Sequence, residues 1–261
     1  MTLNDKLWVA ARSVLPSPAL FLFAFIIMLT GAKGEVIVDD PERYFPFDIG
    51  RQWTYTGVIA DQIQHVSDYT NTAIIKGKTK KRGTPVVVLW ESNQSGREMV
   101  ESYLAKDATG ITYFGSKPMT DFEMQLIPYP VIPFPIVLGK RFVQLEKTGV
   151  TYDLDLDHDG VKEKANILAD LTAVSMETIS TSAGTFQDAI KFEGKMTVWI
   201  QLSKDKRKIA VVGTTTHWFA KDVGMVKQIE KMVFPEGISD TTVETITTEI
   251  LTDYSKPKSP A

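Results

Sequence analysis

The stretch "RKIAVVGTTTHWFAKDVGMVKQIEKMVF", from Arg207 to Phe234, decides the fold class. It is rich in valine, isoleucine, threonine and aromatic residues, which favour β-strands. Alternation within "TTTHWFAK" makes His217 a strand residue beside Trp218. Further along, Gly224 in "KDVGMVK" marks a turn or bulge before the next strand. The stretch therefore predicts two consecutive strands.

The same pattern continues through the chain from Glu35 onward. Two hairpins are predicted, one around the turn "TKKRG" and one around Asp107–Gly110. Only "TDFEMQL" (Thr120–Leu126) and "GTFQDAI" (Gly184–Ile190) indicate short helices. We predict a mainly β protein, a curved antiparallel sheet forming a half-barrel or a sandwich, with one or two short helices.

The composition excludes several classes of function. The chain has 261 residues, a formal net charge of −3 and no cysteine. Disulfides, thiolate metal sites and cysteine nucleophiles are therefore excluded. Since the charge is near neutral, no broad basic face for nucleic acid is expected. We predict a single β-rich domain over residues 35–254 and a disordered tail over 255–261, because "SKPKSPA" is polar and proline-rich.

The N-terminus has the pattern of an export signal. Lys6 and Arg12 precede an unbroken apolar run, Ala19–Leu29, and small residues follow it up to Gly34. That run is shorter than the ~20 residues needed to span a bilayer. We predict a signal peptide over residues 1–34 and an exported bacterial protein, periplasmic or secreted. The alternative is an uncleaved anchor, which would be the chain's only attachment to a membrane.

A second stretch, "DLDLDHDGVKEK" (Asp153–Lys164), carries a dense acidic pattern. Taken as a strand, residues 151–157 would alternate carboxylates on one face with tyrosine and leucine on the other. Like charges so close repel each other unless a cation lies among them. The spacing up to Gly160 resembles the first half of the calcium loop of EF-hand and dockerin-type proteins, D-x-D-x-D-G.

This loop departs from an EF-hand in ways that change its expected role. Position twelve is Asn166, where an EF-hand has a bidentate glutamate, and the flanking segments are predicted strands. The shorter D-x-D-x-D-G-x-x-[DE] loop of β-hairpins in exported proteins is closer, and its calcium ion would be structural. The alternative is a plain acidic turn. The predicted calcium ligands are Asp155, Asp157, Asp159, the carbonyl oxygen of Val161, and Glu163.

The segment "IPYPVIPFPIVLGK" (Ile127–Lys140) has four prolines within eight residues. Prolines at this density exclude a helix and a central strand, so the segment is expected to be extended. One alternative is a crossing segment that plugs the end of a barrel or sandwich. The other is a hydrophobic lip where a partner protein or an apolar ligand docks. The residues predicted to form such a lip are Ile127, Tyr129, Val131, Ile132 and Phe134.

No catalytic constellation is recognisable in the sequence. The histidines His65, His158 and His217 lack a metal-binding spacing, and no G-x-S-x-G elbow, P-loop or dinucleotide motif occurs. We therefore expect a non-enzymatic exported protein that binds a partner protein or an apolar ligand, with a calcium-stabilised hairpin loop. A secreted hydrolase using scattered carboxylates and a structural subunit of an envelope assembly are the alternatives.

Two stretches carry a resemblance to a family. "YFPFDIGRQWTYTG" (Tyr44–Gly57), and "GTFQDAIKFEG" followed by "HWFAKDVGMVKQIE", resemble an uncharacterised set of bacterial exported proteins that are often lipoprotein-like. The resemblance implies a curved antiparallel sheet, comparable to Lol-type lipoprotein carriers, in which a half-barrel holds acyl chains. Independently of it, Trp53, Tyr55, Trp218 and Phe219 are expected to be core aromatics.

Overall fold

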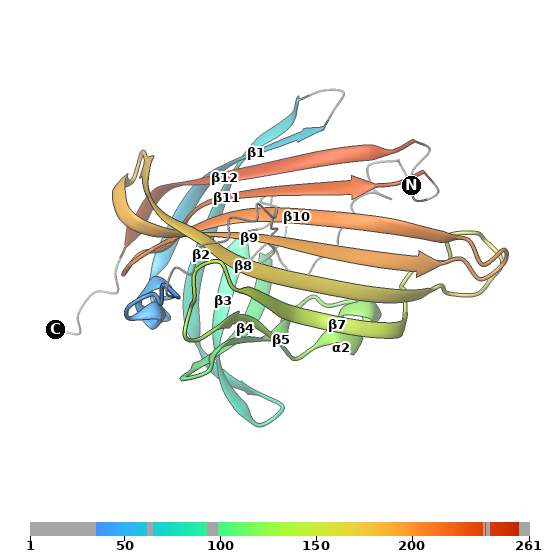
Figure 1. The fold of residues 1–261 in the computed structure, drawn as a ribbon, viewed down its shortest axis with the longest axis horizontal. Coiled ribbons are helices and arrows are strands. Elements are labelled where there is room, and N and C mark those ends of the chain that lie inside the picture. Colours follow the sequence, from blue (N-terminus) through green and yellow to red (C-terminus); the bar gives the residue numbers. More distant parts are fainter. Residues whose placement is uncertain (1–34, 62–64, 93–98, 237, 239–240, 256–261) are drawn as a thin grey trace.

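The computed structural model describes residues 35–61, 65–92, 99–236, 238 and 241–255 (Figure 1). The predicted signal peptide and the residues beyond Ser255 lie outside this part. The helical elements described are a 3-10 turn, η1 (Pro41–Tyr44), and one α-helix, α2 (Asp121–Leu126). The strands are β1 (Gln52–Asp61), β2 (His65–Lys81), β3 (Thr84–Ser92), β4 (Met99–Asp107), β5 (Gly110–Lys117), β6 (Tyr129–Pro133), β7 (Arg141–Thr151), β8 (Lys164–Thr181), β9 (Gly184–Gln201), β10 (Lys208–Ala220), β11 (Gly224–Phe234) and β12 (Val243–Ser255).

All twelve strands form one antiparallel sheet that follows the chain order. The first and last strands pair with each other, Gln52 lying opposite Ser255, so the two edges of the sheet are β6 and β7. The sheet curls until these edges approach each other, and it forms a nearly closed barrel (Figure 1). Both predicted hairpins are present, as β2–β3 and β4–β5. The predicted fold class, a curved antiparallel sheet, is confirmed.

Strand alternation determines which side chains fill the interior. Along β11, buried and half-buried residues alternate from end to end. The four aromatic residues expected in the core are all buried. Trp53 Nε1 donates a hydrogen bond of 2.6 Å to the carbonyl of Val223. Its ring lies so close to Gly224 that a Cβ there would be 3.3 Å from Nε1, and the φ of +102° at Gly224 also favours glycine.

One of the two segments that indicated a helix is a strand. Residues 184–190 begin β9, and Gly184 pairs with Thr181 across the tight β8–β9 turn, so the helix predicted there is wrong. Sheet pairing overrides a weak local preference in this hairpin. The other segment is α2, and it begins with a capping box in which the side chain of Thr120 accepts from Glu123 N while the Glu123 side chain accepts from Thr120 N.

The proline-rich segment lies at the incomplete closure of the barrel. Its first part is the edge strand β6, which pairs with β5, as proline permits at an edge. Between β6 and β7, Gln144 Nε2 donates a 2.7 Å hydrogen bond to the carbonyl of Val131. Residues 36–38 pair with residues 136–138 through the Ile37–Val137 bridge and cover the connection. No helix in the described part is long and apolar enough to cross a membrane.

Candidate functional site

The acidic stretch forms the loop 152–163 between β7 and β8, whose ends Thr151 and Lys164 pair with each other. A strand over residues 151–157 was expected, and this is wrong, because β7 ends at Thr151 and a series of bends follows. The expected burial of the tyrosine and the leucines of this stretch is nevertheless present. Tyr152 is fully buried edge-on against Phe122, at 5.3 Å between ring centroids, and Leu154 and Leu156 pack against the core.

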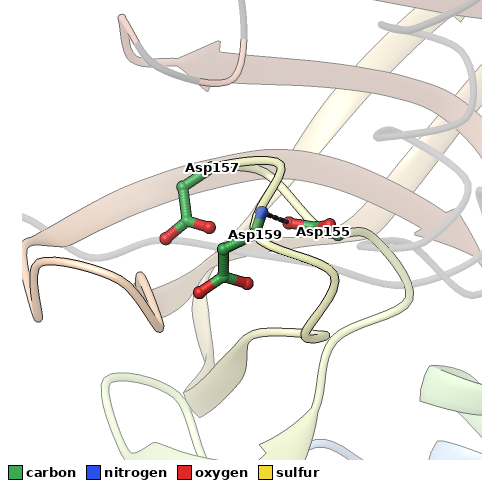
Figure 2. A group of neighbouring side chains, drawn as sticks. All are labelled: Asp155, Asp157 and Asp159. Atoms are coloured by element: carbon green, nitrogen blue, oxygen red, sulfur yellow. Dashed lines mark hydrogen bonds between the residues drawn. The ribbon is translucent and has the colours of Figure 1, made fainter.

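Three of the predicted calcium ligands converge in this loop. Asp155, Asp157 and Asp159 each offer a carboxylate oxygen, and these oxygens lie within 4.8 Å of one another (Figure 2). The carboxylate of Asp155 accepts hydrogen bonds from the backbone N–H groups of Asp159 (3.2 Å) and Gly160 (2.8 Å). Gly160 has a φ of +88°, so the glycine makes the sharp turn for which the sequence pattern calls.

The turn between β9 and β10 holds this carboxylate group in place. Ser203 Oγ donates to Asp159 Oδ2 at 2.5 Å, and Lys204 N donates to Asp157 Oδ2 at 2.9 Å. The hydrogen bond from Ser203 is the main cause that lowers the pKa of Asp159. The second oxygen of Asp157, Oδ1, is buried and has no hydrogen-bond partner in the described part of the chain. It is an oriented, desolvated acceptor beside two further carboxylates.

The other predicted ligands lie differently. Glu163 is fully buried, and its carboxylate accepts from Leu156 N (3.1 Å) and Ser203 N (2.7 Å), so it ties the loop to the β9–β10 turn. It lies outside the group of three aspartates. Val161 N donates to Asp159 Oδ1 at 2.9 Å. The ligand roles of Glu163 and of the Val161 carbonyl stay predictions.

The residues predicted to form a hydrophobic lip divide into two sets. Tyr129, Val131 and Ile132 are buried in the core, which is what the plugging alternative expects. Ile127 and Phe134 are partly buried and pack against that core. Phe134 also borders an open hollow of about 520 Å³. The other residues lining this hollow are Pro41, Glu42, Lys106, Asp107, Ala108 and Pro135.

The sequence analysis missed a polar cluster inside the barrel, to which β10, β11, β12, β2 and β3 contribute. Glu249 is buried, and its carboxylate accepts from Tyr69 Oη (2.9 Å), Asn71 Nδ2 (3.1 Å) and Gln228 Nε2 (2.8 Å). Glu230 is also buried, and burial, followed by the charges of Glu249 and Glu91, raises its pKa to about 8. The remaining buried polar members are His217, Thr215 and Thr247.

His217 lies in this cluster with its imidazole fully buried. Burial lowers its pKa to about 4, so the ring is neutral near pH 7. Neither ring nitrogen has a hydrogen-bond partner in the described residues. Strand alternation at Gln228 and Glu230 was the available signal for this cluster. It was not decisive, because lysines lie on the opposite face of β11 and neither face of this strand is purely apolar.

Comparison with known proteins gives a partial family match. The profile of a family described as DUF3108-like matches residues 159–231, from the end of the acidic loop into β11. No curated protein matches the chain. Two solved structures are similar, a candidate lipoprotein from Parabacteroides distasonis and a candidate exported protein with a YmcC-like fold from Bacteroides fragilis. Each shares 14% identity, covers 81% of this chain and 98% of its own, and superposes with a TM-score of 0.35. None of these descriptions names an enzymatic activity.

Proposed function

We propose that the protein is exported and non-enzymatic, that it binds a partner protein or an apolar ligand, and that calcium stabilises its β7–β8 loop. The observation that carries the calcium part is the buried Oδ1 of Asp157, which has no hydrogen-bond partner among the described residues and lies beside the carboxylates of Asp155 and Asp159. The export part rests on the N-terminal sequence, which has the order of charge, apolar run and small residues of a signal peptide.

The donor set suits calcium. Calcium is a hard cation that takes 6–8 oxygen ligands in flexible geometry, and the three aspartates offer only oxygen. The cation would relieve the repulsion among them and replace the missing hydrogen-bond partner of Asp157. Asp155, Asp157 and Asp159 would hold the ion. Ser203 and Lys204 would keep two of these carboxylates oriented toward it. The ion's role is to pin the hairpin loop.

Thermal melting with and without calcium tests this proposal. Because Asn166 stands at position twelve instead of a glutamate, we expect weak affinity, on the order of 10⁻⁴–10⁻³ M. Millimolar calcium should then raise the melting temperature by a few degrees, and chelator should remove the gain. Asp157→Asn should lose the response. Asp39→Asn, which changes an exposed carboxylate elsewhere, should keep it. A wild-type melting temperature that ignores calcium would contradict the site.

The hollow beside Phe134 is the place we propose for an apolar ligand. Its volume of about 520 Å³ falls within the range of small-molecule sites, ~300–1,000 Å³. Phe134 and Pro135 give it an apolar wall, and the ring of Phe134 lies 6.1 Å from that of Phe45 in the core. A long-chain fatty acid is a suitable probe for this chemistry.

Ala108 offers a direct test of the hollow. It lines the hollow and is exposed, so Ala108→Arg should block the site with a long charged side chain while changing the melting temperature little. We expect a fluorescent fatty acid to bind the wild type and Ala108→Ser, and to lose most of its binding in Ala108→Arg. Equal binding by all three proteins would exclude this hollow as the site. Absence of binding to the wild type would contradict the apolar-ligand part of the proposal.

A further inference from the structure

The polar cluster inside the barrel lies on neighbouring strands and in direct register. Glu230 on β11 lies opposite Thr215 on β10 and Thr247 on β12. Gln228, two residues earlier and on the same face, lies opposite His217 and Glu249. Side chains paired in this way have Cβ atoms ~4.5–5.5 Å apart. The two glutamates are therefore diagonal neighbours within the same wall.

The two carboxyl groups are treated differently by their surroundings. Glu249 accepts three side-chain hydrogen bonds, two at Oε1 and one at Oε2, which favour its ionised form, but burial outweighs them and raises its pKa. Glu230 Oε1 is buried and has no partner in the described residues. Neither residue forms an ion pair within the described part of the chain. The buried basic side chain Arg51 is occupied elsewhere, with Asp48 and the carbonyl of Asp222.

Among the described residues, the titratable groups around Glu230 and Glu249 supply no positive charge. They are His217 on β10, Glu249 on β12, Glu91 on β3, Tyr55 on β1 and Tyr69 on β2. Burial keeps His217 neutral and raises the pKa of both tyrosines. If Glu230 and Glu249 were both ionised, two negative charges would therefore lie side by side in a desolvated interior. A proton on one of the two carboxylates is the simplest species that removes this repulsion.

We propose that Glu230 holds a proton in the closed barrel, and that loss of this proton loosens the sheet where β11 and β12 meet β1. Glu249 lies opposite Gly57 of β1, so this place is also where the first and last strands join. The proposal goes beyond the proposed function, because it makes the barrel interior sensitive to pH independently of the calcium loop and the hollow.

The direction of the effect follows from the two protonation states. Glu230 titrates near 4.5 when unfolded and near 8 in the barrel, so the folded protein holds the extra proton between these values. Its contribution to stability is fully present below pH 4.5 and is lost as the pH rises through 8. Above pH 8, the strands around Glu230 should open more often than strands far from it, such as β4 and β5.

Hydrogen exchange and thermal melting at pH 6.5 and pH 9 test the proposal. After correction for the pH dependence of intrinsic exchange, wild-type peptides from β11 and β12 should exchange on the order of tenfold faster at pH 9. The melting temperature should fall by roughly 5 °C between the two values. Glu230→Gln, which keeps the shape and cannot ionise, should remove both effects. Glu244→Gln should keep both, because Glu244 pairs with Lys231 outside the cluster.

Several results would overturn the proposal. One is a wild type whose corrected exchange rates and melting temperature are the same at pH 6.5 and pH 9. Another is a Glu230→Gln variant whose exchange still becomes faster, and whose melting temperature still falls, as in the wild type. A third is recovery of the wild-type melting temperature and slow exchange at pH 9 on addition of calcium or sodium, which would make the cluster a cation site. If Glu230→Gln does not fold, NMR titration of the wild-type Glu230 carboxyl carbon decides, and a pKa near its ordinary value contradicts a bound proton.

Discussion

At the scale of single residues, Gly57 shows how closely the polar interior is packed. A Cβ built on Gly57 would lie 2.0 Å from Cζ of Tyr69, the residue opposite it on β2. The tyrosine ring therefore lies directly over the glycine, and its hydroxyl reaches Glu249 from there. Glycine at this position is required by packing and not by backbone conformation, since its φ is not in the left-handed region. The hydrogen bonds of Glu249 thus depend on a residue that has no side chain.

Gly57→Ala should consequently destabilise the protein by about 3 kcal/mol, the upper end of overpacking costs. Part of this cost should come from displacing Tyr69 and its hydrogen bond. In a Tyr69→Ala background the methyl group has space, so the two changes should cost less together than the sum of their separate costs. Chemical denaturation of the four proteins measures this coupling. Additive costs within about 0.5 kcal/mol would show that the ring does not depend on Gly57.

At the scale of elements, the sequence was most informative where polarity alternated clearly. The hairpins around residues 82–83 and 107–110 were predicted because turn residues separate apolar runs. The D-x-D-x-D-G spacing identified the three aspartates that converge, because a tight turn at a glycine brings alternate side chains together. The strand predicted over residues 151–157 is wrong. Asp153 accepts a hydrogen bond from Phe122 N on α2 and so does not lie with the three aspartates that converge. That contact is tertiary and has no local signal.

The interior cluster could not be predicted for a related reason. Thr247 and Glu249 alternate with Ile246 and Ile250 on β12, and a sequence reader would bury the isoleucines. The structure does the opposite, leaving Ile246 and Ile250 more than a third exposed and burying Glu249. The pairing of β12 with both β1 and β11 determines which face points inward, and this pairing is known only once the sheet has closed. The inward face of β12 therefore contributes Thr247 and Glu249 to the interior polar cluster.

At the scale of the whole molecule, the buried residues Glu230 and His217 act on stability in opposite directions as the pH changes. Lowering the pH from 8 to 4.5 favours the fold through Glu230, which takes up its proton more readily when folded. Lowering it from 6.5 to 4 disfavours the fold through His217, which takes up its proton more readily when unfolded. Between pH 4.5 and 6.5 the folded protein holds a proton on Glu230 and the unfolded chain holds one on the histidine. In this range the two groups therefore contribute equal and opposite slopes to the free energy of unfolding as a function of pH.

Wild-type stability should therefore be nearly constant with respect to these two groups between pH 4.5 and 6.5, and should fall above and below this range. Glu230→Gln should expose the histidine alone, so its free energy of unfolding should fall as the pH drops from 6.5 to 4. Lowering the pKa of His217 from 6.5 to about 4 corresponds to roughly 3 kcal/mol in the free energy of unfolding. His217→Gln should show the reverse, a fall from pH 4.5 upward to 8. Urea denaturation of both variants and the wild type measures these slopes. A Glu230→Gln profile that stays level between pH 6.5 and 4 would mean that His217 is protonated inside the barrel, which its burial argues against, since burial outweighs the opposing effect of Gln228 on its pKa.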